Sequence, residues 1–133
     1  MEDKRNPLGG GHLESSEKLR IILKSALDKK AEEPVVLDLK GLTSLADYFV
    51  ILTATSETHA RTVTDEIRKK LKEKGVVPVS TEGYDTANWI LLDYGDVIVH
   101  IFKPEVRELY NLESLWMDAP RLNVEEIINE PVQ

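Results

Sequence analysis

The sequence predicts a single α/β domain, α+β-like, with a mixed β-sheet of about five strands flanked by helices. The chain has 133 residues, enough for one hydrophobic core but too few for two. Hydrophobic residues make up 41% of it, which is typical of a globular protein and not of a disordered one. Amphipathic helical patterns alternate with runs rich in β-branched and aromatic residues, an order that indicates helices packed on a sheet.

The N-terminal half predicts a tail, a helix, two strands and a second helix. Residues 1–15 contain Pro and three consecutive Gly without hydrophobic periodicity, so we interpret them as a flexible tail or a cloning remnant. An amphipathic helix follows. Strands are predicted at residues 35–39 and 47–54, and the second is apolar enough for the centre of a sheet. Ser56 is a suitable N-cap for the next helix, and Gly75 closes it.

The C-terminal half predicts a β-hairpin between a short strand and a last helix. The short strand covers residues 76–79, the hairpin covers 88–102, and Pro104 fits the first position of the helix. Residues 119–133 look like a loosely attached acidic tail. The folded domain is therefore expected at residues 16–118.

The hairpin carries polar and aromatic side chains that a purely structural element does not need. A turn centred on Tyr94-Gly95 would pair Trp89 with His100, and alternation then makes one face wholly aliphatic. The other face collects Trp89, Leu91, Asp93, Asp96, Ile98, His100 and Phe102. Aromatic anchors beside acidic residues favour a partner-binding face, since Trp and Tyr are enriched in interface hot spots. The alternative is that the second helix covers this face and satisfies the indole and imidazole internally.

Catalytic, metal and cofactor chemistry find little support in the sequence. The chain has no Cys, and its three His lack metal-ligand spacing. Neither a GxGxxG nor a GxxxxGK[ST] phosphate loop is present. We expect no enzyme, no catalytic residue, no metal and no cofactor. Because no apolar run is long enough to span a bilayer, we expect a cytoplasmic protein without a membrane partner.

The charge pattern disfavours nucleic acid as the main partner. The net charge is −7, and residues 75–102 contain no Lys or Arg while Glu82, Asp85, Asp93 and Asp96 are present. A surface built from this segment would repel phosphate and attract a basic protein. The alternative reading is that these strands are simply buried, which would also exclude Lys.

Four motifs together resemble the ribosomal silencing factors, the RsfS or Iojap-like family, over about residues 17–118. They are "ADYFVILTATS", the Glu-Gly pair at 82–83, "WILLDYGDVIVHIF", and R-x-x-Y-x-L-E-x-L-W from Arg107 to Trp116. The resemblance implies a nucleotidyltransferase-like topology without the catalytic signature. It also implies binding to a protein of the large ribosomal subunit at the intersubunit face. This would block subunit joining and repress translation under nutrient limitation.

The resemblance assigns roles by position. Partner-binding roles fall on Glu82, Trp89, Leu91, Asp93, Tyr94 and His100, and supporting roles on Asp47, Gly83, Arg107, Tyr110, Glu113 and Trp116. Arg107 and Glu113 are six apart on the expected helix, so we expect them to bond elsewhere, with Arg107 buttressing the hairpin. Trp116 is expected to pack in the core. The implied partner is a basic large-subunit protein, with little direct contact to ribosomal RNA.

Two other interpretations stay open. The first is a nucleotide-dependent transferase in which Asp47, Asp93 and Asp96 hold metal ions. The second is a homodimer that pairs the Trp-bearing face of the hairpin with itself, which is compatible with ribosome binding.

Overall fold

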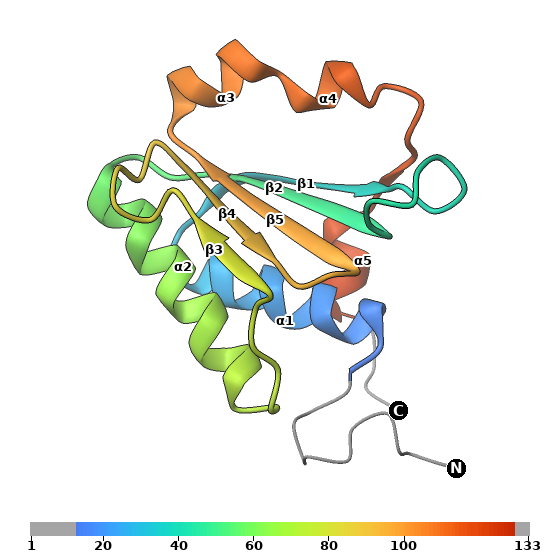
Figure 1. Cartoon of the computed structure of the whole chain (residues 1–133), viewed down its shortest axis with the longest axis horizontal. Helices are drawn as coiled ribbons and strands as arrows, with labels where there is room; N and C mark the ends of the chain where they lie inside the picture. Colours follow the sequence, from blue (N-terminus) through green and yellow to red (C-terminus); the bar gives the residue numbers. More distant parts are fainter. Residues whose placement is uncertain (1–12, 130–133) are drawn as a thin grey trace.

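Six strands form one mixed sheet in the order β3-β4-β5-β2-β1-β6 in the computed structural model, which describes residues 13–129 (Figure 1). The strands are β1 (Glu32–Asp38), β2 (Tyr48–Thr53), β3 (Ser80–Glu82), β4 (Trp89–Asp93), β5 (Val97–Phe102) and β6 (Arg121–Leu122). Strands β2 and β5 run parallel, and the other neighbouring pairs run antiparallel. The predicted class and mixed sheet are confirmed, with one more strand than expected.

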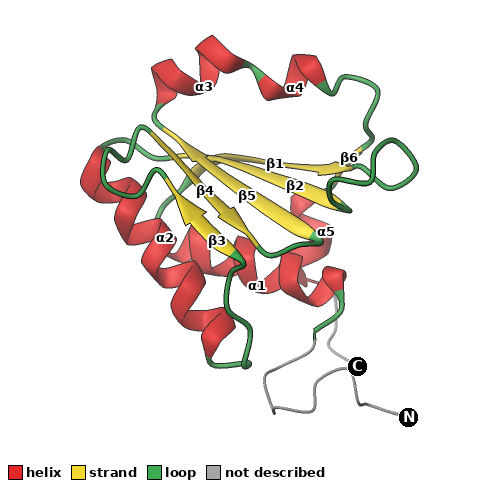
Figure 2. Cartoon of the chain, in the orientation of Figure 1, coloured by secondary structure: helices red, strands yellow, loops and turns green. Residues whose placement is uncertain are grey.

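Helices cover both faces of the sheet (Figure 2). They are α1 (Ser15–Asp28), α2 (Glu57–Lys72), α3 (Pro104–Tyr110), α4 (Leu112–Leu115) and α5 (Val124–Asn129). Helices α1, α2 and α5 lie on one face, and α3 and α4 cross the other. Each face therefore has its own hydrophobic cluster. Within residues 13–129, no helix combines the length and apolar character that crossing a membrane requires.

The predicted elements of the N-terminal half are confirmed. All six residues of β2 are buried, because this strand lies between β1 and β5 and under helices on both faces. Ser56 caps α2 by accepting a hydrogen bond from the backbone N–H of His59 at 3.0 Å. Gly75 follows the helix with a φ of 80°, a left-handed conformation that glycine adopts without strain.

Two expectations about the chain after α2 are wrong. Residues 76–79 form no strand. Only the Val79 N–H bonds to β4, and Val77 and Val79 are exposed while Val76 packs in the core. The supposed tail from residue 119 belongs to the fold as far as Asn129, because β6 pairs with β1 and α5 packs against α1. The expected N-terminal tail lies mostly outside the described residues.

The predicted last helix is two short helices. Asn111 adopts the left-handed conformation, φ 48° and ψ 60°, which ends α3. Its side chain then accepts a hydrogen bond from the Ser114 N–H at 3.4 Å and starts α4. Asn tolerates this conformation better than most residues and is also a good N-cap, so one residue serves both ends. The break redirects α4 across the sheet and changes which side chains meet.

Candidate protein-binding face

The hairpin register differs from the predicted one by two residues. Trp89 pairs with Phe102 and Asp93 with Ile98, so Gly95-Asp96 form the centre of the turn. Gly95 has a φ of 88°, and its N–H donates to the Asp93 carboxylate at 2.7 Å, which fixes the turn one residue later than expected. A two-residue shift keeps the paired side chains of both strands on their predicted faces, since the side-chain period of a strand is two. Asp96 is the exception, because it lies in the turn and bonds to Lys18 and Ser15 of α1 on the other side of the sheet. The specific pairs were wrong, but the division into two faces was right.

Tyr94 lies on the aliphatic face and is 5% exposed. It packs in the cluster beneath α1 and α2, and burial raises the pKa of its phenol to about 12. Its hydroxyl makes no hydrogen bond with any described residue. The expected partner contact by Tyr94 therefore does not fit the fold, because the residue continues the core side of β4 beyond Asp93.

Replacing Tyr94 with Phe is expected to leave the free energy of unfolding unchanged or raise it by about 1 kcal/mol. A buried hydroxyl without a partner costs about 1–3 kcal/mol, and the substitution removes it while keeping the ring. Urea denaturation measures the difference. Tyr94→Ala serves as the comparison, with an expected loss of about 3–5 kcal/mol from the cavity. A loss above 1 kcal/mol in the Phe variant would show that the hydroxyl is bonded after all.

His100 is buried, with 4% of its surface exposed, so it is not a contact residue either. Its ring lies edge-on to Phe49 at 4.6 Å and stacks with Phe102 at 6.0 Å. The Nδ1 atom accepts a hydrogen bond from the indole N–H of Trp89 at 3.1 Å, which places the proton of the neutral ring on Nε2. Burial lowers the pKa of His100 to about 4. His100 therefore positions Trp89 instead of touching a partner.

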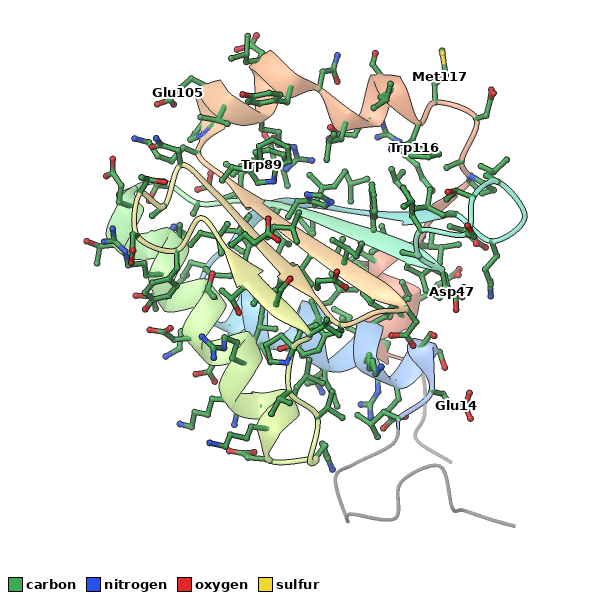
Figure 3. All side chains as sticks on the ribbon, viewed as in Figure 1. Glu14, Asp47, Trp89, Glu105, Trp116 and Met117 are labelled. Atoms are coloured by element: carbon green, nitrogen blue, oxygen red, sulfur yellow. The ribbon has the colours of Figure 1, made fainter. Side chains whose placement is uncertain are left out.

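Trp89 is the half-buried centre of the face and lies between the sheet and α3 (Figure 3). Its ring contacts Phe102 below at 4.9 Å and Tyr110 of α3 at 4.8 Å, between ring centroids. Its open edge lines a shallow hollow with Glu82, Gly83 and Leu91. This hollow gives a partner access to the indole.

Gly83 allows the loop before β4 to pass this close to Trp89. It has a φ of 78°, and a Cβ at this position would overlap the backbone carbonyl oxygen of Trp89. Only glycine satisfies both conditions. The supporting role assigned to Gly83 thus has a physical basis, because the glycine sets one wall of the hollow.

Helices α3 and α4 cover much of the face that the sequence suggested was open. The covering element is thus the last helical segment and not the second helix. Leu109, Leu115 and Met117 on the outer side of this segment are 72–79% exposed, and Tyr110 is 53% exposed. We call these four residues the α3–α4 patch. The sequence contained a signal for it, since "LYNLESLWM" has more apolar residues than one buried helix face needs.

The α3–α4 patch has acidic surroundings. Glu105, Glu108 and Asp118 are exposed on the same segment. Both cations of residues 103–118 are already paired with carboxylates. Lys103 bonds to Glu57 at 2.7 Å, and Arg107 bonds to Glu113 at 2.6 Å. The field around the patch is therefore negative.

Arg107 holds the α3–α4 segment on the sheet. Its buried guanidinium donates to the Glu33 carbonyl at 2.7 Å and to the Thr53 hydroxyl at 2.8 Å. It also donates twice to one carboxylate oxygen of Glu113, from Nε and Nη2. Burial alone would raise the pKa of Glu113, but the bonds from Arg107 lower it below its usual range. The expectation that Arg107 and Glu113 bond elsewhere is wrong, and Arg107 braces β1 and β2, not the hairpin.

Trp116 takes the packing position expected of it. It is half-buried beneath α4 (Figure 3) and lies edge-on to Phe49, with 5.9 Å between the rings. Trp116 and the aromatic rings of β2, β4 and β5 thus form one continuous layer that reaches Tyr110 of the patch.

Comparison with known proteins identifies the family. The family model described as "Ribosomal silencing factor during starvation" matches residues 12–133. The chain belongs to the RsfS family. It is 39% identical to a ribosomal silencing factor RsfS from Halalkalibacterium halodurans over 117 residues, covering 88% of this chain and 100% of that protein. A crystal structure from Chromobacterium violaceum has a TM-score of 0.77 at 34% identity, covering 79% of this chain and 88% of the other. A mouse protein named "Mitochondrial assembly of ribosomal large subunit protein 1" is 33% identical, covering 66% of this chain and 40% of the mouse protein.

The RsfS family name describes a regulator of the ribosome and not a catalysed reaction. Only two of the three carboxylates of the transferase alternative lie together in this RsfS chain. Asp96 and Asp47 meet at the start of α1, where Asp96 bonds to Lys18 at 2.8 Å and Ser15 at 2.6 Å. Asp93 bonds to its own turn instead. Among residues 13–129, no three acidic or His side chains are grouped so as to hold a metal ion.

Proposed function

We propose that this protein binds a basic protein of the large ribosomal subunit at the intersubunit face and sterically blocks subunit joining. The docking surface comprises the open edge of Trp89 and the α3–α4 patch. The observation that carries the proposal is the exposure of Leu109, Tyr110, Leu115 and Met117 on one segment with acidic neighbours. Repression under nutrient limitation then follows from occupancy of the subunit and needs no catalytic step.

The chemistry of this surface suits a cationic protein partner. Half-exposed aromatic rings such as Trp89 and Tyr110 supply large contact areas and are typical hot-spot residues. A rim of carboxylates attracts Lys and Arg and repels RNA phosphate at the same place. An ordinary interface buries about 1,600 Å² in total, an area large enough to keep a second subunit from the same site.

The aromatic layer beneath the patch supports a preformed surface. Trp89 is held by His100 and contacts the tilted ring of Tyr110, so its side chain loses little freedom when a partner binds. Arg107 fixes the helices that carry the patch. The names of the relatives support the ribosome as the target, since they refer to ribosomal silencing and to assembly of the large subunit.

Sucrose-gradient sedimentation with purified subunits tests the proposal. The protein should co-sediment with large subunits, should not co-sediment with small ones, and should lower the fraction of joined ribosomes in proportion to its occupancy. Light scattering in the same buffer tests the predicted homodimer. Absence from the large-subunit peak would reject the proposed function.

Placing Lys at Leu115 and Met117 is expected to weaken large-subunit binding at least tenfold. The double variant inserts two cations where a basic partner would dock, and tenfold corresponds to about 1.4 kcal/mol. Both side chains are exposed, so the fold should persist. Leu42→Lys with Leu45→Lys is the matched control, since these exposed residues lie in the connection between β1 and β2. Equal affinity of the two double variants would argue against the α3–α4 patch.

A further inference from the structure

The charges of this acidic protein are segregated between the two faces of the sheet. Residues 15–30 and 57–74, which form α1 and α2 with their ends, contain 11 of the 17 Lys and Arg but only six of the 24 Asp and Glu. Helices α1 and α2 with their ends thus have a formal charge of +5, α5 on the same face contributes −2 from Glu125 and Glu126, and the rest of the chain has −10. Helices α1 and α2 lie across the sheet from the α3–α4 patch (Figure 1). The net charge of −7 conceals a cationic face.

A groove between α1 and α2 concentrates these cations. Its walls carry two pairs of cations at i,i+4 spacing, Arg20 with Lys24 on α1 and Lys70 with Lys74 on α2. The groove has a volume of about 410 Å³ and also contains Asp28, Glu66 and Glu73. A neighbouring hollow adds Arg68, Lys69 and Lys72 beside a single carboxylate, Asp65. The cationic surface therefore continues around α2.

Most of these cations have no ion-pair partner within residues 13–129. Salt bridges among the described residues engage Lys18, Arg20, Lys103 and Arg107. No described carboxylate pairs with Lys24 or with the five cations of 68–74, all of which are exposed. Unpaired, flexible cations keep their full charge available to an external anion.

The helix macrodipole does not account for the whole arrangement. Cations in the last turn of α2 stabilise the partial negative charge there, and this explains Lys69, Lys70 and Lys72 individually. The last turn of α1, by contrast, contains no basic residue, and Lys24 lies before it. Cations from two helices line one groove, which a dipole effect on each helix does not require.

We propose that the α1–α2 surface binds the phosphate backbone of RNA. The choice of RNA over other polyanions rests on the proposed ribosome association. Lys side chains neutralise phosphates as point charges, so the contact would be independent of base sequence and sensitive to salt. At physiological ionic strength the Debye length is about 8 Å, so the acidic residues across the sheet are largely screened. This proposal revises the expectation of little RNA contact, which rested on the net charge of the chain and on the absence of Lys and Arg from residues 75–102.

Salt dependence of binding to an RNA hairpin tests this surface apart from the docking patch. Fluorescence anisotropy between 50 and 200 mM KCl should give a linear fall of log K with log [KCl]. Lys70→Gln with Lys74→Gln should reduce the magnitude of that slope by about 2, one for each lost phosphate contact. Lys40→Gln with Arg121→Gln removes the same charge outside α1 and α2 and should leave the slope unchanged. Equal slopes for both variants would overturn the proposal.

Crosslinking on the ribosome distinguishes RNA from an acidic protein. The chain has no Cys, so Lys74→Cys provides one thiol for a benzophenone label. With large subunits, the labelled protein should give nuclease-sensitive adducts, and protease-sensitive adducts alone would overturn the proposal. If the protein fails to co-sediment yet retains the slope on the hairpin, the proposed function fails and the RNA surface stands. If the protein co-sediments with large subunits but gives no nuclease-sensitive adducts, and the Lys70/Lys74 variant has an unchanged salt slope, the proposed function stands and the RNA surface fails.

Discussion

Replacing Arg107 with Met is expected to lower the free energy of unfolding by about 3–5 kcal/mol. The substitution leaves the Glu113 carboxylate in a poorly hydrated position without its cation, and breaking a buried ion pair by removing one partner is strongly destabilising. The Glu33 carbonyl and the Thr53 hydroxyl also lose their donor. Urea denaturation monitored by Trp fluorescence measures the change, since both Trp contact this layer.

A double-mutant cycle separates the ion pair from the other bonds of Arg107. Adding Glu113→Leu to Arg107→Met should restore part of the lost stability, because the unpaired charge is removed and apolar replacements of buried pairs are often tolerated. Glu113→Leu alone should also destabilise. A loss below about 1 kcal/mol for Arg107→Met would mean that α3 and α4 are held mainly by their apolar contacts. Large-subunit binding should fall with the same variant, since the helices carry the docking patch.

Local patterns made most of the fold predictable. The continuous apolar run of β2 indicated a strand covered on both faces, and it is buried throughout. Ser56 followed by an amphipathic pattern located the start of α2 to the residue. These signals depend on neighbours within a few residues, so tertiary contacts did not have to be known.

The elements missed at the C-terminus depend on partners far away in sequence. Strand β6 has two residues and exists because Val36 and Leu37 of β1 offer an open edge. Helix α5 has a weaker but readable signal, since Val124, Ile127 and Ile128 follow helical spacing and pack on the core. The acidic residues of this segment made it resemble a tail instead. The break at Asn111 depends on local sequence, but the apolar pattern continues across it and so predicted one helix.

The sequence predicted which side chains lie on the Trp89 face of the hairpin, but not which of them are exposed. Alternation assigned the paired hairpin side chains to the correct faces, because the register error was an even number of residues, and failed only for Asp96 in the turn. Burial of His100 was not predictable, since it depends on where α3 and α4 cross the sheet. The path of α3 and α4 across the sheet depends on the bond between Arg107 and Glu113. In the continuous helix that the sequence predicts, these two residues are too far apart to bond.

Lowering the pH from 6.5 to 4 is expected to reduce the free energy of unfolding by up to about 3 kcal/mol through His100. Burial lowers the pKa of His100 from 6.5 to about 4 in the folded protein. Above pH 6.5 the ring is neutral in both states, and its contribution to stability is complete. Between pH 6.5 and 4, His100 is protonated in the unfolded chain but stays neutral in the folded protein. The free energy of unfolding therefore falls as the pH falls. The difference between the two pKa values sets the size of the effect.

His100→Gln provides the control for this pH dependence. Glutamine can still accept the Trp89 N–H bond but does not titrate, so the variant should be less stable at pH 7 and lose less on acidification. Urea midpoints at pH 7, 6 and 5 compare the two proteins before the carboxylates titrate. NMR titration of the His100 ring should give a pKa below 5. A pKa near 6.5 would mean that water reaches the imidazole. The residue that positions Trp89 would then be solvent-exposed and mobile, contrary to the structure.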